Sequence, residues 1–406
     1  MPLISAGLGG ALLLQALLCG WFSGLVQRRL VPSAAARPGH AASPGWPAAE
    51  VVLCLRGVDP ALEQALAALA AQHYGGPWRL LLVLDSRQDP AWELVETSLQ
   101  RLQASGGASW QAARLTALTD PPYRGSRKSA ALHQAFGELA PATELVALVD
   151  ADAVVRPDWL QNLAAACRRP GVGAGGGNRW YLPAHSSGPG MVRAIWNGGA
   201  LVLMTLLAIP WGGSLAIQRP LIASSGWRQQ LRTSLCEDTA LTTPLRRSGR
   251  RFHFAPQLIA VDRNDSITLR PLIRWIARQL VMARLHHPAW PLVLLHGLGS
   301  ILLLLAALSL LLALLLQAAL APALALGAAL LAYELGCGLL LLWIQATVAR
   351  AIPLERRLPL GLWLRWLPLA QLVYGLAAVR AQLASQVEWS GVTYRLRGHA
   401  VEAIDG

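Results

Sequence analysis

The chain has 406 residues, of which 54% are hydrophobic and only 14% are charged. Soluble domains usually carry about 25% charged residues, so this composition excludes an ordinary soluble protein and predicts a membrane protein with one folded polar domain. The net charge of +13 does not indicate a nucleic-acid partner, because arginines cluster beside apolar stretches, as in Gln27-Arg28-Arg29, and such clusters are typical of the cytosolic side of membranes.

The N-terminal segment, residues 1–30, is predicted to be a membrane anchor. Residues 7–26 are apolar and long enough to cross a bilayer, which takes about 20 residues. Basic residues follow this stretch and none precedes it, so the positive-inside rule places the N-terminus outside and the next segment in the cytosol. A cleaved signal peptide is the alternative, but it requires a basic region before the apolar run.

Residues 31–48, rich in Pro, Gly, Ala and Ser, are predicted to be a linker. From 49 to 269, strand-like runs alternate with helix-like segments, which predicts an α/β domain with a mostly parallel sheet. Two of the buried strands run directly into aspartates, at Asp85 and at Asp150. Ligands of such sheets bind at the carboxyl ends of the strands, so these aspartates are candidate site residues.

The C-terminal part alternates between apolar and basic segments. Residues 190–210 are apolar and are interpreted as an interfacial or re-entrant helix rather than a free-standing span. Residues 270–289 form a basic amphipathic pattern typical of the membrane surface. Residues 290–347 predict two transmembrane helices. Residues 348–406 contain a basic loop, a third hydrophobic segment at 360–379, interpreted as interfacial or re-entrant, and a tail whose side of the membrane stays open.

The five cysteines, Cys19, Cys54, Cys167, Cys236 and Cys337, are scattered along the chain. Their number is odd and no pair has CxxC spacing, so neither a disulfide framework nor a zinc site is predicted. A reducing cytosol is the simplest environment for the domain that carries them.

The most specific polar motif is Asp150-Ala151-Asp152 at the end of the strand LVALV. Two carboxylates one residue apart at a strand end suit a divalent cation, Mg²⁺ or Mn²⁺, that bridges a diphosphate. The alternative is a polar turn at the end of the strand.

The acidic pair Glu237-Asp238 precedes a helix-like segment. A carboxylate at this place can act as a general base that removes a proton from a hydroxyl. Capping of the helix N-terminus is the structural alternative, because acidic residues favour first turns.

Two weaker signals complete the candidate site. Gly212, Gly213 and Ser214 are small, so the backbone there can approach a sugar or an acceptor closely. Lys128 could reach a phosphate, although its surroundings do not match a Walker A loop. A glycine turn and a solvated loop are the respective alternatives.

In this order, the segments resemble glycosyltransferase family 2 with the GT-A fold, and in particular its ceramide glucosyltransferase branch. The similarity runs from Arg56 to Gly398 and includes the tail EWSGVTYRLRG. The resemblance implies a role for each matching residue. Asp85 would contact the uracil, Lys128 the nucleotide, Asp150 and Asp152 the metal and diphosphate, Gly212, Gly213, Ser214 and Glu237 the sugar and acceptor pocket, and Asp238 would be the catalytic base.

One motif of that family, (Q/R)xxRW near the membrane, is incomplete here. Arg274 and Trp275 are present and are assigned to the acceptor pocket, but Pro271 stands at the first position of the motif. Arg278 and Gln279, about one turn further along the helix, are alternatives for the missing contact.

The expected function is therefore the inverting transfer of a sugar from a UDP-sugar to the hydroxyl of a ceramide- or diacylglycerol-like membrane lipid. Glucose is the sugar that the resemblance implies. The alternatives are a processive polysaccharide synthase, a hopanoid-type lipid glycosyltransferase, and a catalytically silent lipid-binding scaffold. The protein is expected to be integral to the membrane (the plasma or inner membrane if bacterial), with the catalytic domain facing the cytosol. Its oligomeric state stays open.

Overall fold

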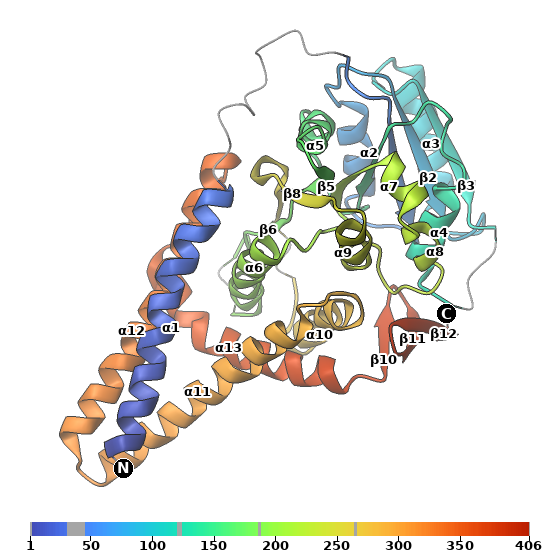
Figure 1. Cartoon of the computed structure of the whole chain (residues 1–406). Helices are drawn as coiled ribbons and strands as arrows, with labels where there is room; N and C mark the ends of the chain where they lie inside the picture. The colour runs from blue at the N-terminus through green and yellow to red at the C-terminus, as the bar shows by residue number, and fades with distance from the viewer. Residues whose placement is uncertain (1, 31–44, 120–123, 186–187, 264–265, 406) are drawn as a thin grey trace.

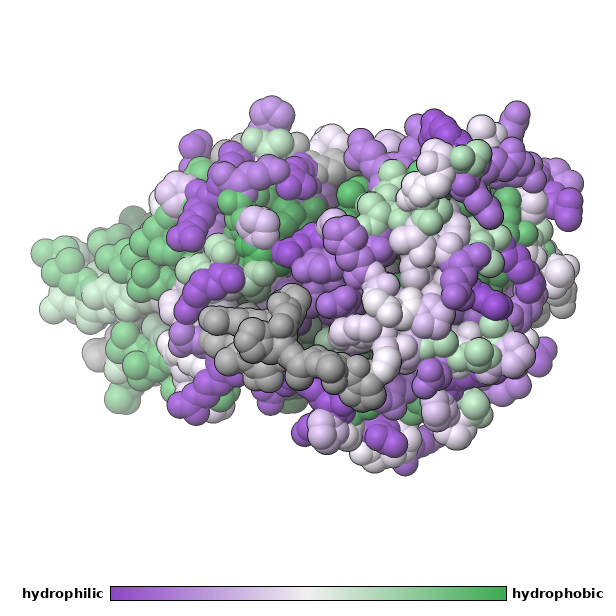
Figure 2. Space-filling view, turned by 90° about the horizontal axis from the view of Figure 1, so that it is seen from above, coloured by the Kyte–Doolittle hydropathy of each residue, from purple (hydrophilic) through white to green (hydrophobic). Residues whose placement is uncertain are grey.

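The computed structural model describes residues 2–30, 45–119, 124–185, 188–263 and 266–405. Most of the expected linker, residues 31–44, lies outside the described residues. Figure 1 shows an α/β domain from which long helices extend to one side. Seen from above in Figure 2, this extension is covered by hydrophobic side chains, whereas hydrophilic residues dominate the surface of the domain.

The domain is built on a seven-stranded sheet with the order β3-β2-β1-β4-β7-β5-β8. Strand β7 is antiparallel to both neighbours, and the other pairs are parallel, which confirms the predicted α/β class with a mostly parallel sheet. The strands are β1 (Ala49–Leu55), β2 (Trp78–Leu84), β3 (Ala112–Ala117), β4 (Leu145–Val149), β5 (Val172–Gly176), β7 (Ser214–Gln218) and β8 (Arg251–Phe254).

Helices cover both faces of the sheet. Successive side chains of each strand point to opposite faces, so each strand contributes to two cores. In β1, Val51 and Leu53 pack into a core with α2 (Leu62–Ala70), α3 (Trp92–Ala104) and α5 (Trp159–Cys167). Val52 points the other way, into a second core. That second core contains α4 (Arg127–Ala135), α7 (Arg219–Ser224), α8 (Trp227–Gln230) and α9 (Asp238–Arg247). Burial on both faces explains why these strands are apolar runs rather than alternating patterns.

Five helices among the described residues are long and apolar enough to cross a membrane. They are α1, which runs Pro2–Leu30 in full, α6 (Gly188–Leu207), α11 (Trp290–Leu316), α12 (Leu320–Ala351) and α13 (Leu360–Leu383). In Figure 1, α1, α11 and α12 form the extension, with α1 lying along α12. Helix α13 runs across them and packs against α6 and against α10 (Leu269–His286).

A second, two-stranded sheet of β6 (Arg179–Tyr181) and β9 (Ala260–Asp262) lies next to α6. The tail forms a third sheet of β10 (Gln386–Trp389), β11 (Val392–Arg397) and β12 (Ala400–Asp405). This tail sheet is held to the α/β domain by two hydrogen bonds. The amide of Gly125 donates to the carbonyl of Val401 at 2.9 Å, and the amide of Val401 donates to the carbonyl of Thr233 at 3.0 Å. The characteristic C-terminal sequence therefore returns to the sheet edge where α4 begins.

Candidate active site

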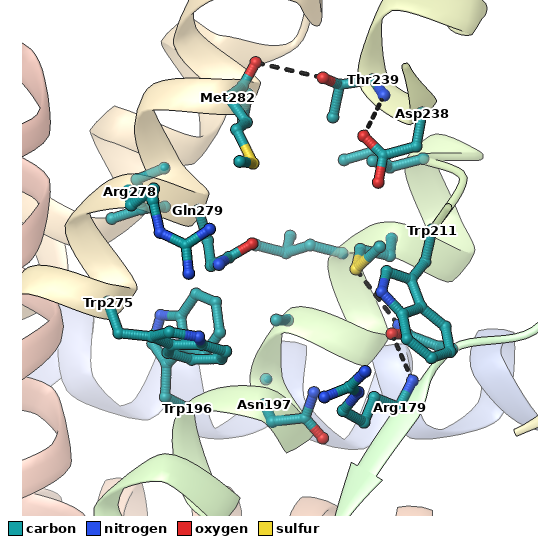
Figure 3. A pocket seen from close by; sticks show the side chains of 18 of the residues that line it. Arg179, Trp196, Asn197, Trp211, Asp238, Thr239, Trp275, Arg278, Gln279 and Met282 are labelled. Atoms are coloured by element: carbon teal, nitrogen blue, oxygen red, sulfur yellow. Dashed lines mark hydrogen bonds between the residues drawn. The ribbon is translucent and has the colours of Figure 1, made fainter. Parts of the chain in front are cut away.

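A cavity of about 990 Å³ lies where the carboxyl ends of the central strands meet the apolar helices. Its lining includes Asp85, Lys128, Asp150, Asp152 and Asp238 from the α/β domain. It also includes side chains of α1, α6, α10, α11, α12 and α13, so a single space joins the sheet edge to the helices that could span a membrane. Figure 3 shows part of this cavity, with polar and aromatic side chains surrounding an open centre.

Lys128 links two carboxylates at the centre of the sheet edge. Its Nζ lies 2.7 Å from Asp150 Oδ1 and 2.7 Å from Glu237 Oε1. Burial disfavours the charge of Lys128, but the two carboxylates outweigh this effect and raise its pKa. Burial also opposes ionisation of Asp150, yet Lys128 and Arg179 lower the pKa of that carboxyl. The lysine and Asp150 are therefore both charged in the site.

Glu237 is buried directly behind Lys128, with a relative exposure of 1%. Its backbone carbonyl accepts a hydrogen bond from Trp227 Nε1 at 3.2 Å. Burial raises the pKa of the Glu237 carboxyl in spite of the attraction by Lys128. We conclude that Glu237 holds the lysine in place, because its carboxylate is buried and lies 2.7 Å from Lys128 Nζ at the edge of the cavity.

Asp238 is the first residue of α9. Its Oδ2 accepts a hydrogen bond from the amide of Gly212 at 3.0 Å, and its Oδ1 accepts one from the amide of Thr239. The Thr239 hydroxyl donates to the carbonyl of Met282 on α10 at 3.3 Å, as Figure 3 shows. Burial raises the pKa of Asp238, and the amide of Gly212 partly offsets this effect. A carboxylate of raised pKa that faces a cavity suits proton abstraction.

The glycines before β7 permit this close arrangement. A Cβ at Gly212 would lie 1.9 Å from Glu237 Oε1, and a Cβ at Gly213 would lie 2.5 Å from Asp150 Oδ2. A side chain at Gly212 would therefore displace Glu237, and one at Gly213 would displace the Trp211 ring or Asp150. Ser214 differs, because its Oγ is buried, accepts from Trp159 Nε1 at 2.9 Å and donates to the carbonyl of Leu258. Ser214 supports the loop from inside the core and is not among the residues that line the cavity.

Arg179 holds the second aspartate of the DxD motif. Its guanidinium donates two hydrogen bonds of 2.8 Å to Asp152 and also lies 3.6 Å from Asp150 and 3.1 Å from Asp262. The same guanidinium packs over the ring of Trp211, at 4.9 Å from the ring centre. Arg179 was not predicted as a site residue. The sequence signal for this role is weak: Arg179 follows the strand β5 by three residues, at the start of β6.

Asp85 lies at the end of β2, away from the Lys128 network. It pairs with Arg127 at 3.2 Å and with Arg56 at 3.7 Å. The amide of Arg127 donates to the hydroxyl of Tyr394 in the tail sheet at 3.2 Å, and Tyr394 also lines the cavity. The tail thus lines this side of the site. From the sequence, the tail had served only as evidence of the family resemblance.

The incomplete (Q/R)xxRW region divides between surface and cavity. Trp275 lines the cavity and packs edge-to-face against Trp196 at 5.4 Å. Arg274 is exposed and does not belong to the lining, because it points to another side of α10. Arg278, about one helical turn later, lines the cavity and lies over the ring of Trp389 at 5.6 Å. The cavity-facing arginine of this region is therefore Arg278.

The donor set at the sheet edge fits a divalent cation that arrives with a diphosphate. No group of three or more His, Cys, Asp or Glu side chains suited to a metal occurs among the residues that the structure describes. Asp150 and Asp152 both face the cavity, however, and Mg²⁺ is commonly held by one or two carboxylates together with substrate phosphates and water. Lys128 and Arg179 neutralise these carboxylates when no cation is bound.

The model of the family described as "Glycosyl transferase family 21" matches residues 12–401. The chain belongs to this family. The match confirms the prediction that the chain is a glycosyltransferase. The predicted resemblance was to family 2, whereas the family whose model matches is family 21. A comparison with the curated proteins gives no significant match.

Solved structures similar to this chain include a mannosyltransferase from Pyrobaculum calidifontis in complex with GDP-Man and Mn2+. The two are 18% identical, the match covers 94% of this chain and 99% of that one, and the TM-score is 0.50. Glucosyl-3-phosphoglycerate synthase of Mycobacterium tuberculosis is 18% identical over 61% of this chain and 82% of that one, with a TM-score of 0.37. At this level of identity, the first of these likenesses supports the fold and nothing beyond it.

Proposed function

We propose that this glycosyltransferase transfers a single sugar, with inversion, from a UDP-sugar to a hydroxyl of a membrane lipid. The observation that carries the proposal is the single cavity that joins Asp150 and Asp238 to α1, α6, α11, α12 and α13. An acceptor that reacts at the sheet edge can keep its hydrocarbon part among the apolar side chains of these helices. A water-soluble acceptor would have no need of such a wall.

The sheet edge is suited to the nucleotide donor. Asp85, which pairs with Arg56 and Arg127, would accept hydrogen bonds from the uracil. Lys128 and Arg278 present positive charge toward the diphosphate from two sides of the cavity. Asp150 and Asp152 would hold Mg²⁺ or Mn²⁺ on the diphosphate, and the bound cation would neutralise the charge that develops on the departing UDP.

Asp238 is the proposed catalytic base. Its carboxylate removes the proton of the acceptor hydroxyl while the hydroxyl oxygen attacks the anomeric carbon of the sugar. The bond between that carbon and the UDP oxygen breaks on the opposite side, so the configuration at the carbon inverts. Glu237 and Lys128 fix the position of the sheet edge during this displacement, and Gly212 and Gly213 let the sugar approach the carboxylates closely.

The finer assignments rest on the resemblance and on charge. Glucose as the sugar and a ceramide- or diacylglycerol-like lipid as the acceptor are what a ceramide glucosyltransferase-like member of this family would use. Basic residues at the end of α1, Arg28 and Arg29, favour a cytosolic position for the domain that follows. The same arrangement supports α1 as an anchor, with α11 and α12 as spans and α10 at the membrane surface.

The proposal can be tested by measuring UDP release from UDP-glucose, UDP-galactose and UDP-N-acetylglucosamine by the purified protein in nanodiscs. Each donor is offered with extracted membrane lipids and, as a control, without added lipid. We expect release with one donor, and only when a lipid acceptor is present. Release that is independent of lipid, or absent with every donor, would overturn the proposal.

A further inference from the structure

The C-terminal sheet reaches the cavity with three of its residues, none of which takes part in the proposed transfer. Trp389, at the end of β10, lines the cavity together with Ser390 and Tyr394. In Figure 1 the sheet follows α13 and lies at the lower edge of the α/β domain. The contacts of Trp389 and Tyr394 show which groups of the active site the sheet holds.

Trp389 supports Arg278. No carboxylate of the described residues forms an ion pair with Arg278, whereas Lys128 and Arg179, the cations beside the DxD motif, are both held by carboxylates. The guanidinium of Arg278 lies over the ring of Trp389 instead, at 5.6 Å from the ring centre. A cation over an aromatic face is held there while the N–H groups at its edge stay available. Figure 3 shows the guanidinium directed into the open centre of the cavity. Arg278 is therefore a positioned cation with donors left for an anionic ligand.

Tyr394 supports the helix turn from which Lys128 extends. Its hydroxyl accepts a hydrogen bond from the amide of Arg127, the first residue of α4, at 3.2 Å. In the same turn, the side chain of Ser126 accepts from the amide of Ser129 at 3.1 Å. The first amides of a helix have no partner within the helix, so these two bonds fix the turn that contains Lys128. Tyr394 is only 2% exposed, so packing fixes its ring as well.

Strand β12 joins this turn to the segment that leads to the proposed base. The amide of Val401 donates to the carbonyl of Thr233, and the carbonyl of Val401 accepts from the amide of Gly125. Thr233 precedes Asp238 by five residues, and Gly125 precedes Lys128 by three. A single residue of the tail therefore links the two loops that carry the base and the lysine.

We infer that the C-terminal sheet is a positioning element of the donor site. Trp389 orients Arg278 toward the diphosphate of the UDP-sugar, and Tyr394 holds the turn of Lys128. Both are positioning residues that act through these cations and do not react themselves. Loss of either contact therefore weakens the binding of UDP and of the UDP-sugar, and leaves the binding of the lipid unchanged. The inference rests on the proposed function, because it takes a UDP-sugar as the donor.

A double-mutant cycle between Trp389 and Arg278 tests the first contact. The Kd for UDP in the presence of Mg²⁺ is measured by calorimetry on the full-length protein in nanodiscs. Trp389→Leu should weaken UDP binding by about fivefold, and Trp389→Tyr, which keeps an aromatic face, should retain most of the affinity. In the Arg278→Leu background, Trp389→Leu should add less than about twofold, because Trp389 acts through the arginine. In steady-state kinetics, the KM for the UDP-sugar should rise while the KM for the lipid stays within about twofold.

Tyr394→Phe tests the second contact, because it removes one hydroxyl and keeps the ring. It should also raise the Kd for UDP, by about fivefold. Matched controls repeat both changes outside the cavity lining. Trp92→Leu removes a ring that lies 5.3 Å from the guanidinium carbon of Arg87, and Tyr74→Phe removes a hydroxyl that donates to the carbonyl of Pro47 at 2.6 Å. Both controls should leave the Kd for UDP within about twofold of the wild type.

The outcomes separate the inference from the function on which it rests. Unchanged UDP affinity in both tail variants, or an undiminished effect of Trp389→Leu in the Arg278→Leu background, would overturn the inference while lipid glycosylation still stands. An equal loss of affinity in the matched controls would also overturn it, since the cause would then be a general loss of packing. If Trp389→Leu does not fold, Tyr394→Phe decides, because it removes a single oxygen atom. A wild-type protein that neither binds UDP nor uses any UDP-sugar would instead be a failure of the proposed function.

Discussion

The two ends of the cavity differ in the charge of the side chains that line them. At the sheet end, the carboxylates of Asp85, Asp150 and Glu237 are each paired with a cation of the protein. At the end formed by α6 and α10, Asn197 Oδ1 is buried without a partner in the described part of the chain, and Trp196 packs against Trp275. The acidic groups of the sheet end are thus held by contacts within the protein, whereas the end formed by α6 and α10 is lined mainly by apolar and aromatic side chains. This contrast predicts that changes at the first end affect reaction or folding and that changes at the second affect selectivity.

The largest effect is expected for Asp238→Asn, which keeps the shape of the sheet end but removes the proposed base. General base catalysis contributes about 100- to 10,000-fold, so kcat should fall by about that factor. UDP binding, measured by calorimetry, should stay within about twofold of the wild type, because Asp238 is not assigned to the nucleotide. A variant with wild-type kcat would contradict the mechanism.

Removal of divalent cations should separate catalysis from stability. Treatment with EDTA should abolish measurable transfer, because the charge on the departing diphosphate is then left without its cation. The melting temperature of the protein without substrates should not change, since Lys128 and Arg179 already neutralise Asp150 and Asp152. Transfer is expected to return with Mg²⁺ or Mn²⁺. Full activity in EDTA would show that Lys128, Arg179 and Arg278 are sufficient for the diphosphate.

Lys128→Met tests the preorganised network through folding. The variant leaves the buried carboxylate of Glu237 without its cation, whereas Asp150 keeps Arg179 at 3.6 Å. Breaking a buried pair in this way typically costs about 3–5 kcal/mol. Chemical denaturation should show this loss. The double variant Lys128→Met/Glu237→Gln should recover part of it, because the uncompensated charge of Glu237 is gone. An unchanged stability of the single variant would mean that Lys128 is not part of the folded scaffold.

The smallest of these effects concerns pH. Burial raises the pKa of Asp238, so its carboxyl stays protonated up to a higher pH than that of an exposed aspartate, which titrates near about 4. Only the ionised form can accept a proton, and kcat should therefore fall as the pH is lowered through the raised value. A pH–rate profile at saturating substrates should place this acid limb above about 4. A kcat that stays constant to lower pH would exclude Asp238 as the base.

The fold and the sheet end could be predicted because their signals are local. Apolar runs that end in aspartate, such as LVALVDAD, report both a buried strand and a ligand at its carboxyl end. Asp85, Asp150 and Asp152 follow that rule and line one cavity, together with Asp238 at the start of α9. Arg179 was missed, because its partners Asp152 and Asp262 lie 27 and 83 positions away in the sequence.

The other end of the cavity could not be predicted in the same way. Whether Arg274 or Arg278 faces the cavity depends on the rotation of α10 about its axis, which the packing of α10 against α13 and α6 determines. Asn197 appears in the sequence as a polar interruption of an apolar stretch, and only the tertiary structure shows that it faces the same space as Gln279. The contact of Tyr394 with Arg127 likewise joins positions 267 residues apart.

The central claim is that one cavity brings a UDP-sugar and a membrane lipid together for a single transfer. The most direct measurement is mass spectrometry of the lipids after incubation of the protein in nanodiscs with UDP-glucose labelled in its hexose with ¹³C. The account predicts a lipid product that has gained one labelled hexose. A ladder of hexose additions would point to a processive synthase, and label found only as free sugar would contradict a lipid acceptor.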